Sequence, residues 1–127
     1  GYADGTEWFP HVKHILSIFD ANKWSNTYWA YFKGMLETPL MDVLDRPYPV
    51  AIPGEITSYR HDREEESFSL CFEQREPCGA PAEIYLHKPP KKIETDFRFE
   101  TQSTGGSGGS ILTVYTEPGK HIIKVCF

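Results

Sequence analysis

The stretch SFSLCFE, residues 67–73, alternates large apolar side chains with small, polar or charged ones. Successive side chains of a β-strand point to opposite faces of a sheet, so this alternation predicts a strand with one face in a core. It is the clearest strand signal in the 127 residues, and the chain that follows it continues in the same style. We therefore expect a mainly β protein.

Further short strand candidates, separated by turn residues, lie on both sides of this stretch. They are residues 55–60, 82–87, 93–100, 111–116 and 121–126. Six strands with no helix between them predict an antiparallel β-sandwich. The charged residues 61–66 are interpreted as a solvated hairpin loop. Residues 104–110, TGGSGGS, have the composition of a flexible linker, and we interpret them as a replacement for a native loop.

The run RPYPVAIPG, residues 46–54, precedes these strands and contains three prolines. Each proline fixes its own φ and disfavours a helical conformation in the residue before it, so this run must be extended. We place a domain boundary here. Residues 46–127 are expected to form the β-sandwich domain, and residues 1–45 a separate piece.

A helix is predicted from about Thr6 to Asp20, with a capping box formed by Asp4 and Glu7 at its start. Its apolar side chains fall on one broad stripe. They are Trp8, Val12, Ile15, Leu16 and Phe19. Such a stripe requires a sizeable apolar surface to pack against.

The run WSNTYWAYFKG, residues 24–34, contains five aromatic rings and lacks clean polar alternation. It predicts a strand over residues 24–32 that is covered on both faces, as in parallel sheets. A helix that leads into such a strand is half of a repeated α/β unit, and one unit cannot close a barrel. Residues 34–45 form a connection, with a helical turn at 40–44.

Composition and cysteine spacing exclude several classes of function. The net charge of −5 and the pI near 5.5 argue against binding of nucleic acid or of an anionic membrane face. Cys71, Cys78 and Cys126 form no CxxC pair, so we expect no zinc site. One disulfide at most can form, between Cys71 and either of the other two. We expect no metal and no cofactor, and no apolar run is long enough for a membrane helix.

The titratable residues give no complete catalytic set. Glu37, Asp42 and Asp45 lie on the connection, where a facing carboxylate pair is not expected. Any of the five histidines could supply a general base. His11 and His14 share one edge of the helix, but further metal ligands are not evident. No nucleophile elbow, phosphate loop or dinucleotide fingerprint is present.

The aromatic run supports two interpretations on pattern alone. It is either an aromatic core strand or a platform for a sugar ring, whose axial hydrogens stack on an indole face.

The runs NTYWAY, residues 26–31, and RPYPVAIPG, about fifteen residues later, resemble the last barrel strand and the junction of endoglycoceramidases and related glycosylceramidases of glycoside hydrolase family 5. These have a similar YWAY segment and an RPYP-x-A-x-x-G segment that leads into a C-terminal β-sandwich.

The resemblance implies a (β/α)8 barrel with a retaining mechanism, in which one glutamate follows the fourth strand and a second, the nucleophile, follows the seventh. Gly1 would correspond to the glycine after the nucleophile, so no catalytic residue is expected in this chain. Residues 1–45 would supply one helix-strand unit of the barrel. Trp29 corresponds to the eighth-strand tryptophan that lines the sugar subsite next to the scissile bond, and Tyr31 would lie at the adjoining rim.

The function that this resemblance implies is that of the C-terminal portion of a hydrolase that cleaves the bond between glycan and ceramide. The expected partners are the N-terminal catalytic portion, as a separate chain or as residues outside this sequence, and a glycolipid substrate. Contact with a membrane surface and a secreted or lysosomal location would follow. The alternative is a non-catalytic β-sandwich module that binds carbohydrate, lipid or protein, with the helix and strand folded back on it.

Overall fold

The computed structural model describes residues 6–28, 30, 32–106 and 108–127. The chain forms two compact units, Gly1–Arg46 and Pro47–Phe127.

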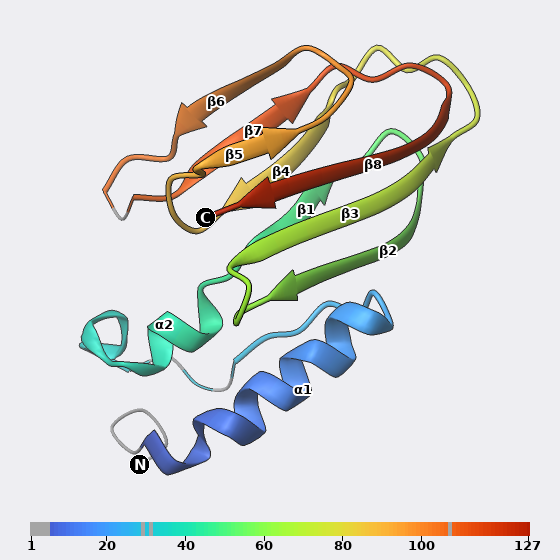
Figure 1. Ribbon diagram of the computed structural model, residues 1–127. Helices are drawn as coiled ribbons and strands as arrows, with labels where there is room; N and C mark the ends of the chain where they lie inside the picture. The colour runs from blue at the N-terminus through green and yellow to red at the C-terminus, as the bar shows by residue number, and fades with distance from the viewer. Residues whose placement is uncertain (1–5, 29, 31, 107) are drawn as a thin grey trace. The chain divides into compact units, whose positions relative to one another are not determined.

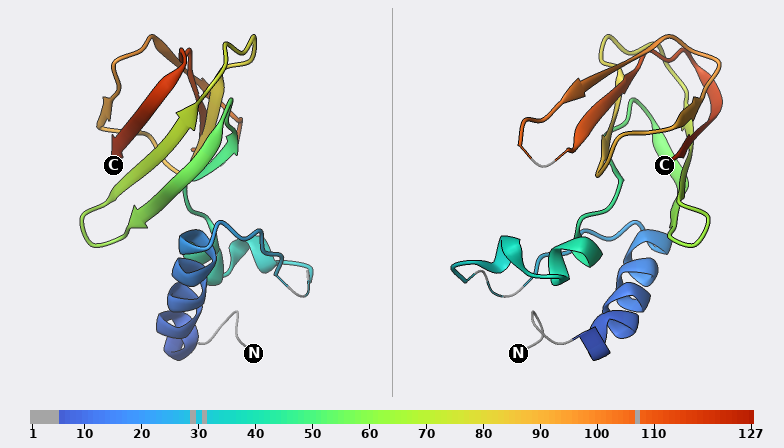
Figure 2. Two further views of the ribbon diagram at one scale, coloured as in Figure 1. Left: turned by 90° about the vertical axis from the view of Figure 1, so that its right-hand side faces the viewer. Right: turned by 60° about the vertical axis from the view of Figure 1, so that its left-hand side comes forward.

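The second unit consists of strands, which can be followed in Figure 1. They are β1 (Tyr48–Ala51), β2 (Glu55–Asp62), β3 (Ser67–Gln74), β4 (Ala82–Leu86), β5 (Lys92–Glu94), β6 (Phe99–Ser103), β7 (Ser110–Val114) and β8 (Gly119–Cys126). One sheet has the order β1-β4-β7-β6 and the other the order β2-β3-β8-β5, with antiparallel pairing throughout. Figure 2 shows the two layers from two sides.

The core of this unit lies between the two sheets, and strand β3 explains how. Its residues alternate between buried and half-buried positions along the whole strand. Phe68 and Leu70 lie opposite Val125 and Ile123 of β8, and all four side chains are almost completely buried. The inward residues of β4 and β7 complete the cluster from the other sheet. The predicted mainly β fold with an antiparallel sandwich is confirmed.

Two predicted segments differ in detail. The expected strand over residues 93–100 is two short strands, because the chain crosses between the sheets there: β5 pairs with β8 and β6 pairs with β7. Phe97 packs against the core at this crossing. Residues 48–51, which were predicted to be extended, pair with β4 as strand β1.

The first unit contains the helices η1 (Thr6–Trp8), α1 (Phe9–Ala21), η2 (Met35–Glu37) and α2 (Leu40–Leu44). The predicted amphipathic helix and the helical turn at 40–44 are confirmed. Asp4, half of the predicted capping box, lies outside the described residues. The core of the unit is small, with Met35 and Leu40 buried among four partly buried apolar side chains.

The prediction of a strand over residues 24–32 is wrong for the residues that the structure describes there. Residues 24–28, 30 and 32 belong to no strand. A strand is held by hydrogen bonds to a neighbouring strand. All strands of the described chain lie between residues 48 and 126 and pair within the two sheets of the second unit, so no ladder partner exists for this run.

The described residues of the glycine-rich run lie in the turn between β6 and β7. The amide and the hydroxyl of Thr104 each donate a 3.0 Å hydrogen bond to the carbonyl of Gly109. Gly105, Gly106 and Gly108 have φ values of 76°, 106° and 81°, in the left-handed region where glycine is favoured. Its composition therefore matches the backbone of a tight turn.

Two further observations concern the chain as a whole. The three cysteines all lie in the described residues, and all are free thiols. Of the helices that the structure describes, none has the length and apolar character needed to cross a membrane.

Candidate functional site

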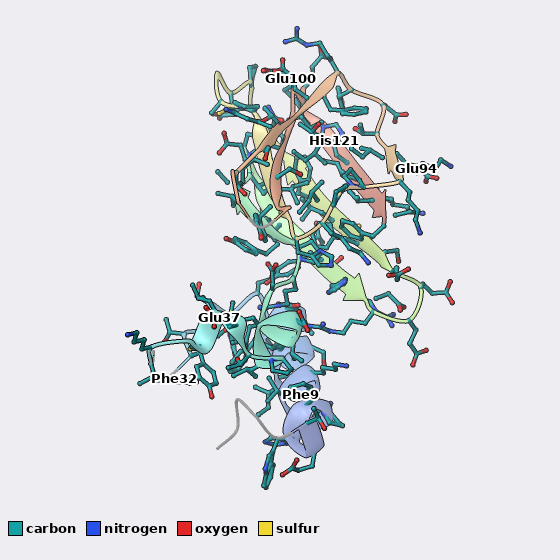
Figure 3. The ribbon with its side chains drawn as sticks, turned by 90° about the vertical axis from the view of Figure 1, so that its left-hand side faces the viewer. Phe9, Phe32, Glu37, Glu94, Glu100 and His121 are labelled. Carbon is teal, nitrogen blue, oxygen red and sulfur yellow. The ribbon has the colours of Figure 1, made fainter. Side chains whose placement is uncertain are left out.

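The aromatic segment, residues 24–32, connects α1 to η2 and presents its described rings to solvent. Trp24 is 57% exposed, and Phe32 also lies at the surface of the first unit (Figure 3). The predicted sugar-binding residues Trp29 and Tyr31 lie outside the described residues, so their role stays a prediction. The described residues of the segment are exposed and rich in aromatic rings.

Both ends of the aromatic segment are fixed by the helices beside it. The amide of Trp24 donates a 2.8 Å hydrogen bond to the carbonyl of Phe19, and the two rings lie 6.3 Å apart. At the other end, the amide of Met35 donates to the carbonyl of Phe32 at 3.0 Å. Gly34 makes this reversal with a φ of 86°. Backbone hydrogen bonds therefore hold the segment at both of its ends.

A buried ion pair links Asp20, near the end of α1, to Arg46, the last residue of the first unit. The guanidinium of Arg46 donates to both carboxylate oxygens of Asp20, at 2.8 and 3.2 Å. The two side chains are only 11% and 9% exposed. Two parallel hydrogen bonds fix both position and orientation. The arginine of the RPYP run thus has a structural role, which the sequence did not predict.

The candidate acids, bases and ligands that precede residue 46 lie on or just after the helices of the first unit, whereas His61, His87 and His121 lie in the sandwich unit. His11 and His14 are exposed on α1, Glu37 is exposed on η2, and Asp42 is exposed on α2. Asp45 follows α2 and is half-buried. In the part of the chain that the structure describes, no group of three or more histidine, cysteine or acidic residues is placed to hold a metal ion.

A pocket of about 160 Å³ lies at one end of the sandwich. His61 at the end of β2 and His87 just after β4 meet there, with ring centroids 5.2 Å apart. The ring of Phe127 contacts His87 edge-on, with centroids 4.7 Å apart. These histidines come from different sheets and lie far apart in sequence, so only the fold brings them together.

Charged side chains form the rim of this pocket. Lys88 donates a 2.6 Å hydrogen bond to Glu66, and this contact holds the pKa of the Glu66 carboxyl below its usual value. The same ammonium lies 6.0 Å from the centroid of the Phe127 ring. Arg63 also lines the pocket. The arrangement can exchange protons through its imidazoles, but the groups that line it include no serine, threonine or cysteine nucleophile.

A third group of functional type is a pair of tyrosines on the outer face of the β1-β4-β7-β6 sheet. Tyr48 of β1 is directly opposite Tyr85 of β4, and their ring centroids are 5.2 Å apart with an interplanar angle of 37°. Tyr48 belongs to the proline-rich run 46–54, whose sequence indicated an extended junction and no binding role. Residues 82–87 were expected to form a strand, but no orientation was predicted for Tyr85, and nothing local indicated its partner.

Residues 46–125 of the chain match the family described as glycoside hydrolase family 5 C-terminal domain. No curated protein matches the chain.

Among solved structures, endo-glycoceramidase II from Rhodococcus sp. superposes with a TM-score of 0.72 and 21% identity. This match covers 96% of the present chain and 30% of that protein. The same enzyme in complex with ganglioside GM3 gives a TM-score of 0.70 and 22% identity, over 93% of this chain and 28% of that one. At identities this low, the superposition shows only that the fold is shared.

A sterylglucosidase from Cryptococcus neoformans, sterylglucosidase 1, superposes with a TM-score of 0.51 and 25% identity. It covers 63% of this chain and 13% of its own length. The chain therefore spans under a third of the length of each of these enzymes.

Proposed function

We propose that this chain is part of a retaining hydrolase that cleaves the bond between glycan and ceramide in glycosphingolipids. The chain belongs to the family of glycoside hydrolase family 5 C-terminal domains, and this membership is the basis of the proposal. In this proposal residues 1–45 complete a (β/α)8 barrel and residues 46–127 form the β-sandwich beside it. The catalytic glutamates belong to the barrel portion outside this chain. Trp29 provides the platform for the sugar next to the scissile bond, with Tyr31 at its rim.

One observation carries this proposal: the first unit exposes large apolar side chains that its own core does not cover. Leu36 is 67% exposed and Trp24 is 57% exposed. Four others in the same 46 residues are also exposed, namely Trp8, Ile18, Tyr28 and Phe32. The sandwich unit, by contrast, encloses a core of eleven buried residues. A cover that removed these half-exposed side chains from water would contribute about 1 kcal/mol for each of them.

The aromatic segment supports the same conclusion. It has strand-forming residues and anchored ends, yet its described residues pair with none of the strands that the structure describes. Neighbouring barrel strands would supply the missing ladder. Several large exposed apolar side chains within 46 residues are what a surface covered by another protein part would present.

The enzymatic test uses the complete enzyme that contains this chain. We expect Trp29→Ala to lower kcat/KM for a fluorescent lactosylceramide by about 10–100-fold, because the sugar loses its stacking surface. Trp8→Ala, at the end of η1 and outside the aromatic segment, is the matched control and should leave kcat/KM within about twofold. Equal activity of the Trp29→Ala and Trp8→Ala proteins would contradict the proposed role of Trp29.

Sedimentation of the isolated chain separates this proposal from the alternative, a non-catalytic sandwich module. A covered barrel piece should self-associate or bind an apolar dye when its partner is absent, because apolar side chains such as Trp24, Phe32 and Leu36 are exposed. A chain that stays monomeric and binds no dye would favour the module. Formation of a one-to-one complex when the barrel portion is added would support the hydrolase.

A further inference from the structure

The outer face of the β1-β4-β7-β6 sheet carries a row of side chains that crosses all four strands. The inward residues of β4 and β7 are completely buried, so the residues that alternate with them face outward. Strand register places Tyr48 opposite Tyr85, Tyr85 opposite Ile111, and Ile111 opposite Gln102. Two aromatic rings, one aliphatic side chain and one amide therefore form a continuous strip across the sheet.

A second row of polar side chains runs beside the first. Glu83 of β4 lies opposite Thr113 of β7, and Thr113 lies opposite Glu100 of β6. Glu100 is exposed at the surface of the sandwich (Figure 3). Hydrogen-bonding groups therefore flank the aromatic strip on β4, β7 and β6, with carboxylates on β4 and β6, whereas the β1 residue opposite Glu83 is Ala51.

The side chains of this face are held in place. The ring of Tyr85 packs so closely over Gly109 that a Cβ atom there would lie 2.8 Å from its hydroxyl oxygen. Beyond the polar row, Tyr115 donates a 3.1 Å hydrogen bond to Glu100, and the guanidinium of Arg98 lies 4.2 Å from the Tyr115 ring centroid. Tyr48 is nonetheless 44% exposed, so part of its ring is open to a ligand.

The chemistry of these two rows matches one class of ligand. A sugar ring has an apolar face of C–H groups and a rim of hydroxyls. Tyrosine rings contact the apolar face through dispersion, and carboxylate and amide oxygens accept hydrogen bonds from the hydroxyls. A few fixed polar groups beside an apolar contact surface are the usual means of orienting such a ligand.

The negative charge of this face favours neutral sugars over acidic ones. The polar row presents two carboxylates, Glu83 and Glu100, whereas the nearby guanidinium of Arg98 is already placed over Tyr115. The chain as a whole carries a net charge of −5. An acidic glycan would be repelled by this surface, and a neutral one would not.

We propose that this face is a binding platform for a neutral oligosaccharide. Tyr48 and Tyr85 contact the sugar ring, and the side-chain oxygens of Glu83, Glu100 and Gln102 accept hydrogen bonds from its hydroxyl groups. The site lies entirely within the sandwich unit. Binding there does not depend on the proposed hydrolase activity.

The test is a titration of the isotopically labelled full chain, followed by NMR, with lactose, cellotriose and maltotriose as neutral probes. We expect at least one of them to shift the backbone amides of Tyr85, Gln102 and Thr113 with a saturable dissociation constant. Sialyllactose should bind several-fold more weakly than lactose. If no neutral probe shifts these amides, or if sialyllactose binds more tightly than lactose, the proposal is wrong.

Variants then assign the binding to this face. Tyr48→Ala should weaken binding by about tenfold, because it removes the most exposed ring of the strip. Ile122→Ala is the matched control on the opposite sheet, where Ile122 is 59% exposed, and should leave binding unchanged. Glu100→Gln keeps an oxygen for Tyr115 and removes the charge, so it should narrow the difference between lactose and sialyllactose.

Two outcomes separate this proposal from others. A simple cross-strand stacking role for Tyr48 would lower the stability of the Tyr48→Ala protein while leaving its affinity for the probe unchanged. Loss of binding in Trp29→Ala with normal binding in Tyr48→Ala would place the sugar on the aromatic segment. Either result overturns the platform, and neither contradicts the proposed hydrolase function.

Discussion

Gly54, the last residue of the RPYPVAIPG run, should not tolerate a side chain, although it lies at the surface. It precedes β2, where Glu55 pairs with Glu73 of β3. A Cβ atom on Gly54 would lie 2.9 Å from the carbonyl carbon of Glu73 and 3.0 Å from the Cα of Gln74, and closer still to the Glu73 carbonyl oxygen. These are backbone atoms of a strand with a neighbour on each side, so they cannot rotate away.

The magnitude follows from two opposing terms. Ordinary carbon contacts are about 3.5–4.0 Å, so an alanine here requires the backbone to move by about 1 Å. Overpacking of this kind costs about 1–3 kcal/mol. Loss of glycine freedom in the unfolded chain offsets about 0.4–1 kcal/mol. Gly54→Ala should therefore lower the free energy of unfolding of the sandwich by about 1–2 kcal/mol.

The assay is urea and thermal unfolding followed by circular dichroism. We expect Tm to fall by about 5–15 °C with an unchanged urea m value. Gly79→Ala is the control, because a Cβ atom there would meet nothing within 4 Å and its φ lies outside the left-handed region. Its stability should stay the same or rise slightly. A Gly54→Ala protein as stable as the Gly79→Ala protein would refute the close approach of this loop to β3.

Three further predictions concern the core, the ion pair and the pocket. Leu70→Ala should lower the free energy of unfolding of the sandwich by about 2–5 kcal/mol, because its completely buried side chain leaves a cavity. A loss below 1 kcal/mol in urea unfolding would contradict this packing. Asp20→Ala removes the carboxylate to which Arg46 donates and should cost the first unit about 3 kcal/mol; the helical circular dichroism signal should then melt earlier, and adding Arg46→Met should restore part of the loss. Lys88→Met should raise the pKa of Glu66 toward its ordinary value of 4.5, as followed by NMR titration. Because the folded pKa of Glu66 is lowered, the stabilisation from this pair is present above the unfolded pKa and is lost as pH falls through the folded pKa; the variant should show no such loss on the acid side, and an unchanged Glu66 pKa would show that Lys88 is not its cause.

Much of the sandwich was predictable because its signals are local. The alternation of β3 and the alternation of β4 each follow from the period-2 geometry of one strand. The prolines of residues 46–54 restrict their own backbone whatever surrounds them. The apolar stripe of α1 likewise follows from the geometry of one helix. The resemblance to family 5 hydrolases also rested on contiguous motifs, and the family match confirms it.

The segments that were predicted wrongly depend on a partner. Residues 24–32 have strand-forming composition, but a strand exists only when a second strand accepts and donates its hydrogen bonds, and the described chain supplies none there. Residues 93–100 were expected to form one strand. They divide because β8 and β7, on opposite sheets, each bind one end of the run.

The sequence by itself determined the strand periodicity, the extended proline-rich junction and the amphipathic helix, because each of these is a property of neighbouring residues. Only the tertiary structure decided that Arg46 binds Asp20, that His61 meets His87, and that Tyr48 and Tyr85 share one sheet face. These pairs are separated by many residues along the chain. Their proximity depends on which strands and helices pack together, and that is settled by the total buried area and hydrogen bonding of the fold rather than by any local pattern.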